Sequence, residues 1–530
     1  MNRFPDASNP PAALPDDGLG FTGRLAGGLR DDLARRRPFY LDDFRQGLHA
    51  KVLASVLFLF FACLANAIAF GGLTDLVTDG RIGTTEMIVA TAAGGIAFAL
   101  FGGQPLTILG GTGPIVIFTG LLYATCERLE LPFLATYAWT GIWSGVLLIL
   151  CAITDASALM RFFTRFTDEI FASLIAVIFI VEAVASMAGP FGETPRDLPA
   201  ALLGVVLSLG TYSLSRTLKS AAQTRFLVGS ARAFLSDFGP TIAIAAMTLV
   251  ALSLPQIRLE VPGIPERFGT TDGRPWRVEL FALPTWAIFA SLAPALMATI
   301  LLFLDQNITT RLVNAPGNRL RKGVGFHLDL LIVGMIVAIG SLFALPWIVA
   351  ATVHSLNHVR SLATTEVVAA NGVQREVVRS VRENRLSGLA IHVLIGCSIL
   401  ILPLIQLIPM AVLFGLFLFM GFNTLAGNQL WDRFLLLFTD PKLYPATHYV
   451  RRVPVARIHL FTAVQVIALV ALWLLKASAL GILFPILIAL LVPLRRALAR
   501  WFPTRELEAL DPDEELDEAE SDLVGGDVHA

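Results

Sequence analysis

Residues 101–118 read FGGQPLTILGGTGPIVIF, and residues 343–356 read FALPWIVAATVHSL. In both stretches an extended-looking run containing a proline reaches a small or hydroxyl residue and then resumes as a short apolar helix. If such a break faced lipid, its backbone N–H and C=O groups would lack partners, so it is tolerated only where the backbone lines a cavity. A pair of breaks at matching places in the two halves of a chain indicates the substrate site of a secondary transporter.

The composition is that of an integral membrane protein. The 530 residues are 55% hydrophobic and only 15% charged, with a mean hydropathy of +0.69, whereas soluble domains carry about 25% charged residues. The net charge of −1 argues against a nucleic-acid partner. Cysteines occur at four scattered positions that form no metal or disulfide pattern, so we expect a structural role for them and no cofactor: Cys63, Cys126, Cys151 and Cys397.

Runs of about 20 apolar residues predict membrane spans. The sequence contains fourteen such runs, several of them short, and the third and tenth are the broken ones. Their approximate ranges are 51–73, 84–101, 105–123, 135–154, 169–189, 198–214, 236–254, 282–305, 327–344, 346–358, 387–402, 407–426, 458–475 and 479–494.

The distribution of lysine and arginine orients these spans. Lys and Arg gather on the cytoplasmic side of membrane proteins. With both termini cytoplasmic, all but eight of the 40 Lys and Arg residues fall on that side, and no inversion occurs along the chain. We therefore expect a multi-pass protein of the cell membrane with both termini in the cytoplasm. The eight outer residues are Arg81, Arg128, Arg196, Arg258, Arg267, Arg274, Arg277 and Lys476.

These observations predict an all-α membrane fold of two inverted seven-span repeats that form a core (transport) bundle and a gate (scaffold) bundle. Because seven is odd, the second repeat has the opposite orientation, and one bundle can rock against the other. We expect a disordered cytoplasmic segment at 1–37, a transporter domain at 38–500 and an acidic cytoplasmic tail at 501–530. The repeats cover about 50–254 and about 282–494, and the third and tenth spans are half-helices preceded by short extended segments.

The two breaks together predict an anion site. Thr112, Gly113 and Pro114 precede one apolar helix, and Ala351, Thr352 and Val353 precede the other. Facing helix N-termini present free N–H donors and partial positive charge, which favour an anion. Ordinary Gly/Pro kinks would explain a single break, but a matched pair favours a site. His354 follows the second break and either titrates near the site or is a neutral, hydrogen-bonded residue of the pathway.

A carboxylate in the eighth span predicts a cation site. Asp305 ends the apolar run 292–304, and an acidic residue at membrane depth indicates function. Thr309 lies four residues on and shares its helix face. A carboxylate with a hydroxyl one turn away suits Na⁺, which prefers oxygen ligands. Proton handling, or a helix-end carboxylate that simply faces water, remain the alternatives.

Many strings in this chain resemble the bicarbonate transporter family, which includes the erythrocyte anion exchanger, the sodium-coupled bicarbonate cotransporters and the borate transporters. The similarity runs from about residue 38 to residue 511. The strings that carry it are FGGLTD at Phe70, FGGQPLTIL at Phe101, TGP at Thr112, TDASAL at Thr154, RFTDEIFASLI at Arg165, LDQNIT at Leu304, KGVGFHLDLL at Lys322, LPWIVAATV at Leu345, RLSGL at Arg385, IPMAVLFGLFLFMG at Ile408 and LWDR at Leu430.

The resemblance is closest to the sodium-coupled branch, because that branch has the Asp-Gln pair and the Thr one turn on. It implies that Asp305, Thr309 and Thr352 are sodium ligands. It places bicarbonate or carbonate between Thr112-Gly113 and Ala351-Thr352-Val353, and it implies a homodimer. His354 departs from the pattern, since the exchangers have Arg there and the sodium-coupled members an aliphatic residue. This departure leaves the ion stoichiometry and the pH dependence open.

The sequence therefore predicts a transporter that moves bicarbonate or carbonate together with Na⁺ by alternating access. The first alternative is a sodium-independent inorganic anion exchanger or a borate transporter in which Asp305 handles a proton. A non-transporting membrane scaffold or sensor is the alternative from another class. An enzyme is not expected, because the sequence contains no nucleophile–base pair or metal cluster.

Overall fold

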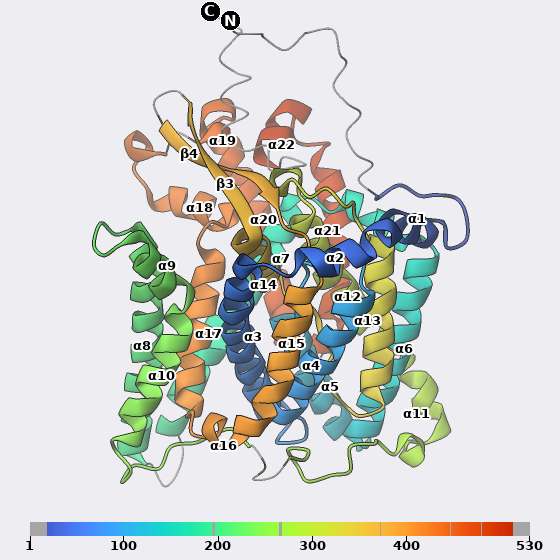
Figure 1. The fold of residues 1–530 in the computed structure, drawn as a ribbon, viewed down its shortest axis with the longest axis vertical. Coiled ribbons are helices and arrows are strands. Elements are labelled where there is room, and N and C mark those ends of the chain that lie inside the picture. The colour runs from blue at the N-terminus through green and yellow to red at the C-terminus, as the bar shows by residue number, and fades with distance from the viewer. Residues whose placement is uncertain are drawn as a thin grey trace, which may run out of the picture.

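The computed structural model describes residues 18–511, apart from 193–196, 264, 266–267, 371–372, 446 and 479. Within this part of the chain the structure is almost entirely α-helical, with two small two-stranded sheets. The helices run roughly parallel to one another, and the ends of the described chain lie on the same side (Figure 1). We call that side the terminus-bearing face.

Nine helical stretches of the described residues are long and apolar enough to cross a membrane, or eleven if two bent helix pairs count as spans. The nine are α3 (Ala50–Val77), α4 (Thr84–Phe101), α6 (Phe133–Ile153), α7 with its 3-10 extension (Arg165–Phe191), α8 (Leu198–Ser220), α11 with α12 (Thr285–Val313), α15 with α16 (Leu386–Ile405), α20 (Val455–Lys476) and η10 with α21 (Gly481–Leu498). The bent pairs are α9 with α10, at 69°, and α17 with the stretch from α18 to η8, at 80°.

The remaining helices are shorter. α5 (Gly113–Arg128), α13 (Phe326–Ser341) and α14 (Thr352–Leu362) lie among the long helices. The bent pairs consist of α9 (Gly229–Asp237) with α10 (Gly239–Leu252), and of α17 (Met410–Leu425) with α18 (Gln429–Leu435) and η8 (Leu436–Phe438). In the first pair Pro240 is the second residue of α10, and in the second pair Gly427 adopts φ +84° between the helices, so each bend has a local cause.

The helices pack as two bundles. The first bundle contains α3, α4, α5, α6, α12, α13, α14 and α15, and the second contains α7, α8, α10, α17, α18, α20 and α21. Apolar side chains join them: the ring of Phe70 on α3 lies 5.8 Å from that of Phe179 on α7 and 6.1 Å from that of Phe417 on α17. Such contacts are non-directional and permit one surface to slide on another.

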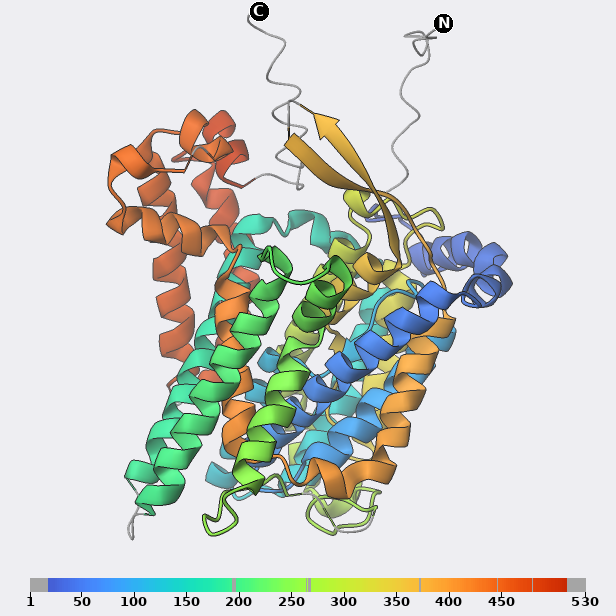
Figure 2. The same ribbon diagram turned by 60° about the vertical axis from the view of Figure 1, so that its left-hand side comes forward.

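Small helices and a β-hairpin cover the terminus-bearing face. α1 (Gly27–Arg36), η1 (Arg37–Phe39) and α2 (Tyr40–Gln46) lie along the first bundle, and α19 (His448–Arg452) and α22 (Thr504–Leu510) cap the second. Strands β3 (Ala363–Ala370) and β4 (Val373–Val381) pair antiparallel and project beyond the helices (Figure 2). The sequence did not predict this hairpin, because the apolar runs on either side of it dominate the pattern.

The prediction that residues 1–37 are disordered is wrong for their second half. Asp155 accepts hydrogen bonds from Thr22 N (3.1 Å) and Gly28 N (2.9 Å), which fixes the start of α1. Asp32, on α1, accepts from the backbone N–H groups of His327 (2.8 Å) and Leu328 at the start of α13. Two helix caps, one at the start of α1 and one at the start of α13, therefore hold this polar segment to the first bundle.

The predicted acidic tail, 501–530, is likewise ordered at its beginning. α22 lies within it, and the Asp511 carboxylate accepts hydrogen bonds from Phe166 N and Thr164 Oγ1, both 2.7 Å long. Residues 512–530 and 1–17, which complete the two terminal predictions, lie outside the described residues.

Candidate functional site

The two broken stretches meet inside the first bundle. Strand β1 (Leu109–Gly110) pairs antiparallel with β2 (Val349–Ala350), with Leu109 opposite Ala350 and Gly110 opposite Val349. A further backbone bond, from Ala351 N to Ile108 O (2.8 Å), extends the ladder. Each strand thus supplies the partners that the broken helix cannot supply, which is the condition for irregular backbone inside a membrane.

Each strand leads directly into a helix start. α5 begins at Gly113, with Thr112 in an extended conformation (φ −129°, ψ 150°) and Pro114 in the first turn. α14 begins at Thr352, with Ala351 extended. No side chain caps either N-terminus, so the backbone N–H groups of both first turns are available to a ligand.

One face of α12 bridges the two helix starts. Thr112 Oγ1 donates to Asp305 Oδ2 (2.7 Å), and the hydroxyls of Thr309 and Thr352 lie 2.6 Å apart. Asp305 and Thr309 are one helical turn apart, so this face of α12 contacts the residue before α5 and the first residue of α14. The Asp305 side chain is buried (8% exposed).

The same helix holds β2 in place through its backbone. Gln306 Oε1 accepts from Ala350 N (3.0 Å), and Thr309 Oγ1 also lies 3.2 Å from Ala350 O. Gln306 belongs to the Asp-Gln pair on which the family resemblance drew, but it was not among the predicted site residues. Its role depends on a strand two residues long, which no pattern of that length predicts.

Buried imidazoles and hydroxyls satisfy the other backbone groups of the first break. Ser355 Oγ accepts from Ile108 N (3.0 Å). His358 contacts Leu106 O (2.9 Å) and Ser387 Oγ (2.7 Å), and His392 contacts Leu109 O (3.2 Å). Sequence reasoning missed all three, because a single polar residue in an apolar helix gives no sign of the carbonyl that it meets.

Asp329 fixes the beginning of the first break. Its Oδ1 accepts from Gly103 N (2.6 Å) and Gln104 N (3.0 Å), and Gln104 in turn bonds Asn314 (2.7 Å), just after α12. Asp329 was not among the site residues predicted from the sequence. The structure makes it a positioning residue, since its carboxylate caps the turn that leads into β1.

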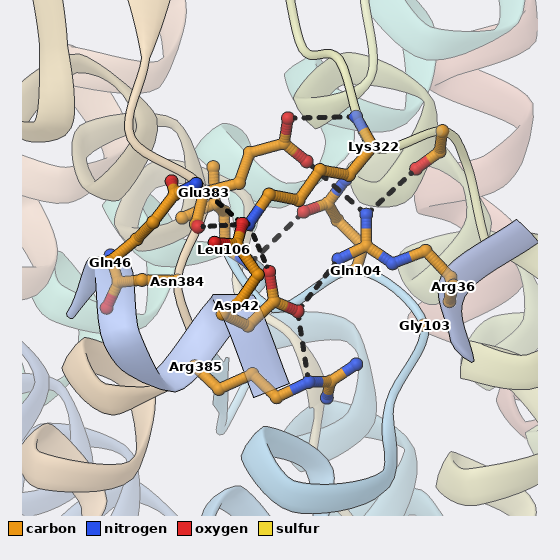
Figure 3. Close-up of polar contacts among 12 residues, drawn as sticks. Arg36, Asp42, Gln46, Gly103, Gln104, Leu106, Lys322, Glu383, Asn384 and Arg385 are labelled. Atoms are coloured by element: carbon orange, nitrogen blue, oxygen red, sulfur yellow. Dashed lines mark hydrogen bonds and ion pairs between the residues drawn. The ribbon is translucent and has the colours of Figure 1, made fainter. Parts of the chain in front are cut away.

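A buried ionic network lies beside this turn on the terminus-bearing face (Figure 3). Asp43, on α2, pairs with Lys322 Nζ (2.7 Å), Arg36 Nη2 (3.3 Å) and Arg385 Nε (3.2 Å). Glu383 pairs with Arg36 (3.3 Å) and accepts from the N–H groups of residues 321 and 322. The network joins α2, the connection from α12 to α13 and the start of α15.

The site lies at the boundary between the two bundles. A Cβ added to Gly113 would meet Phe179 Cζ, on α7 of the second bundle, at 2.7 Å. Only glycine therefore lets the start of α5 approach α7 this closely without a shift. The first bundle supplies the polar contacts of the site and the second bundle covers it.

The structure brings together most of the predicted site residues. Thr112, Asp305, Thr309 and Thr352 are linked by hydrogen bonds, and Gly113 and Ala351 flank them at the helix starts. Gly113 and Pro114 were expected to precede the helix and are instead the first two residues of α5. The roles of these residues as ligands stay predictions.

Val353 and His354 lie less centrally. The Val353 side chain is 55% exposed and, being apolar, adds no hydrogen-bond donor or acceptor to the site. His354 contacts Ala62 O on α3 (3.3 Å) rather than any member of the Thr112–Asp305 group. The hydrogen-bonded pathway residue is therefore the better interpretation of His354.

The donor set suits an alkali cation beside an anion rather than a tightly held transition metal. Among the described residues no group of three or more His, Cys, Asp or Glu side chains could hold a metal ion. One carboxylate and several hydroxyl and carbonyl oxygens are available instead, which are ligands for hard cations. The uncapped helix starts add partial positive charge, which an anion would neutralise.

Known proteins share the sequence of this chain over most of its length. The family model described as "HCO3− transporter integral membrane domain" matches residues 24–198 and 194–515. The human Band 3 anion transport protein is 39% identical over 524 residues, which cover 94% of this chain and 57% of that protein. Horse anion exchange protein 2 is 38% identical over 553 residues, covering 95% and 45%. This chain thus spans about half the length of these curated relatives.

Solved structures share the fold at low sequence identity. The transmembrane domain of the cyanobacterial bicarbonate transporter BicA aligns with a TM-score of 0.57 at 16% identity, over 83% of this chain and 97% of that one. Murine Solute Carrier 26 family member A9, an anion transporter solved in the inward-facing state, gives a TM-score of 0.52 at 13% identity, over 85% and 68%. The family model covers nearly all described residues, and the chain therefore belongs to the bicarbonate transporter family.

Proposed function

We propose that this protein is a secondary active transporter that moves bicarbonate or carbonate across the membrane by alternating access. The observation that carries the proposal is the pairing of β1 with β2, which sets two uncapped helix N-termini beside the buried Asp305. An oxyanion suits the N–H groups of the helix starts. The transporter relatives support the same class of function.

Sodium coupling is the finer part of the proposal. Asp305, Thr309 and Thr352 supply a carboxylate and two hydroxyls close to the helix starts. A Na⁺ ion there would offset the charge of Asp305 and part of the anion's charge, so each ion would strengthen binding of the other.

Sodium-independent exchange is the second candidate, because the named relatives at 38–39% identity are anion exchange proteins. In that case Asp305 would carry a proton or stay bonded to Thr112. Borate remains an alternative substrate within the same class.

The proposal includes the finer topology. Each of the fourteen ranges predicted from the sequence overlaps a helix, which supports two inverted seven-span repeats with α5 and α14 as half-helices. We propose that the terminus-bearing face is cytoplasmic, in a cell membrane, and that the protein is a homodimer. The first bundle would be the transport bundle and the second the gate.

Flux into proteoliposomes tests both candidates. Purified protein would be reconstituted, and uptake of labelled bicarbonate would be followed with an inward Na⁺ gradient, with an equal K⁺ gradient, and with internal chloride or borate. Sodium-driven uptake supports the first candidate, and chloride-dependent uptake that ignores Na⁺ supports the second. If no anion crosses faster than in protein-free vesicles, the transport proposal is wrong.

A further inference from the structure

An ion pair joins the two bundles at the terminus-bearing face. Arg311, in the last turn of α12, pairs through Nη2 with Asp168 Oδ2, in the first turn of α7, and its Nη1 donates to Phe163 O (2.5 Å). α12 belongs to the first bundle and α7 to the second. The side chains are 26% and 22% exposed, so water reaches the pair.

On one side the pair is rigidly connected to the candidate site. Arg311 follows Asp305 by six residues in the same uninterrupted helix, a rise of about 9 Å. The bonds of Gln306 and Thr309 to Ala350 couple α12 to the β1–β2 ladder. A displacement of the site toward either face therefore moves Arg311 with it.

On the other side Asp168 is fixed to the second bundle. Asp511 accepts from Phe166 N and Thr164 Oγ1 and pairs with Arg495 on α21. Glu169, the next residue, pairs with Arg433 Nη2 (2.6 Å) on α18. The first turn of α7 is thereby attached to α18, α21 and the chain after α22, which belong to the second bundle or cap it.

The Arg311–Asp168 ion pair can separate and re-form at a small cost in free energy. It uses only one Asp168 oxygen, because Oδ1 has no hydrogen-bond partner among the described contacts, and a pair of this kind is weaker than a bidentate one. Arg311 lies at a helix C-terminus and Asp168 at a helix N-terminus, where each charge is favoured by its own helix. Each group therefore stays favourably placed after separation.

We propose that the Arg311–Asp168 ion pair closes the terminus-bearing side of the transport pathway and must separate when the site opens to that side. The inference rests on the proposed transport function. It adds two residues that touch neither ion and that set the balance between the two access states.

The first test measures opening without any flux. In a variant whose four cysteines are replaced, Gly317→Cys (after α12) and Glu508→Cys (on α22) place one nitroxide on each bundle at exposed positions. Electron–electron double resonance in nanodiscs then gives the distance distribution. Arg311→Gln and Asp168→Asn should each raise the population of long distances about two- to fivefold, since an accessible pair contributes roughly 0.4–1 kcal/mol.

A double-variant comparison isolates the pair. Arg311→Gln with Asp168→Asn should give the same shift as either single change, because both remove one interaction, and Arg311→Lys should restore part of the closed population. Arg165→Gln is the matched control, since it removes the Arg165–Glu169 pair (3.1 Å) within the second bundle. Unchanged distances in the single variants, additive shifts in the double variant, or an equal shift in Arg165→Gln would overturn the proposal.

Side-specific kinetics give the second test. In oriented proteoliposomes both single variants should lower the apparent KM for bicarbonate on the terminus-bearing side and raise it on the other. A KM that changes equally on both sides would overturn the proposal. A wild-type protein without flux would refute the transport function alone, since the distance measurement still decides whether the pair holds the bundles together.

Discussion

Asp305 is the residue on which the proposed sodium coupling depends most directly. Its carboxylate is buried and bonded to Thr112. Asp305→Asn keeps the size of the side chain and one acceptor oxygen but removes the charge. We expect sodium-driven bicarbonate uptake to fall about tenfold or more, as contacts to a charged group contribute about 1.5–3 kcal/mol.

Glu182→Gln is the control for this change, because Glu182 is a half-buried carboxylate on α7 that forms no hydrogen bond or ion pair with the candidate site among the described residues. It should leave uptake within about twofold of the wild type, as expected for a position without such contacts. Undiminished sodium-driven flux in Asp305→Asn would remove the cation role from this residue.

Asp32 predicts a pH dependence of stability. Burial raises its pKa to about 7, against the hydrogen bonds from Leu328 and His327 and the charge of Arg35. Between about pH 4, the value for an unfolded Asp, and pH 7 the folded state binds the proton more tightly. The contribution of the protonated Asp32 carboxyl to the free energy of unfolding is therefore fully present below about pH 4 and is lost as the pH rises through 7.

Asp32→Asn removes this titration. Its thermal midpoint, measured relative to that of the wild type in one detergent, should rise steadily from pH 4.5 to pH 8. Asp31→Asn, an exposed neighbour, should show a flat difference. A flat difference for Asp32→Asn as well would show that the burial of this carboxyl does not control stability.

At the scale of elements, the anchoring of α2 depends on a charge with three cationic partners. Asp43 is fully buried, and its loss leaves Lys322, Arg36 and Arg385 near one another. Because an unpaired buried charge costs about 3–5 kcal/mol, we expect Asp43→Asn to lower the thermal midpoint by many degrees and the yield of folded protein.

The exposed pair of the hairpin is the matched control. Glu366 and Arg379 lie 3.9 Å apart with side chains 61% and 71% exposed, so Glu366→Gln should change stability by less than about 0.5 kcal/mol. Equal midpoints for the two variants would show that the network does not anchor α2.

The sequence predicted the elements that carry strong local signals. The prolines and small residues at 101–118 and 343–356 predicted both breaks, and α5 and α14 begin where the hydroxyl residues stand. The β1–β2 pairing was beyond reach, because two-residue strands leave no periodicity and their partners lie 240 residues apart in the chain. The caps of α1 and α7 were missed because Asp155 and Asp511 act at long range.

At the scale of the whole molecule, the sequence predicted a membrane protein, but not which helices form each of the two bundles. That partition depends on which helix faces meet, and helices apolar on all sides give no amphipathic stripe to orient them. The Arg311–Asp168 pair is an example. Asp168 lies in the string RFTDEIFASLI and Arg311 shortly after LDQNIT, but only the packing of α12 near α7 brings the two side chains together.

The orientation of the molecule makes a prediction of its own. With a cytoplasmic terminus-bearing face, Arg277→Cys in the 255–281 connection lies outside and Gly317→Cys lies inside, and both positions are exposed. A membrane-impermeant maleimide should label the first in intact cells and the second only after permeabilisation. The reverse pattern would invert the topology derived from the charge distribution.

The β1–β2 ladder has a mechanical consequence. Two helix starts that share backbone bonds, with α12 bonded to both of them, cannot hinge independently. A local flap at either break would have to pull apart a ladder inside hydrocarbon, where the freed groups find no water. Under the proposed transport function, the bound ion and the two helix starts would therefore move together as one rigid unit. The apolar contacts among Phe70, Phe179 and Phe417 would form the surface along which that unit slides.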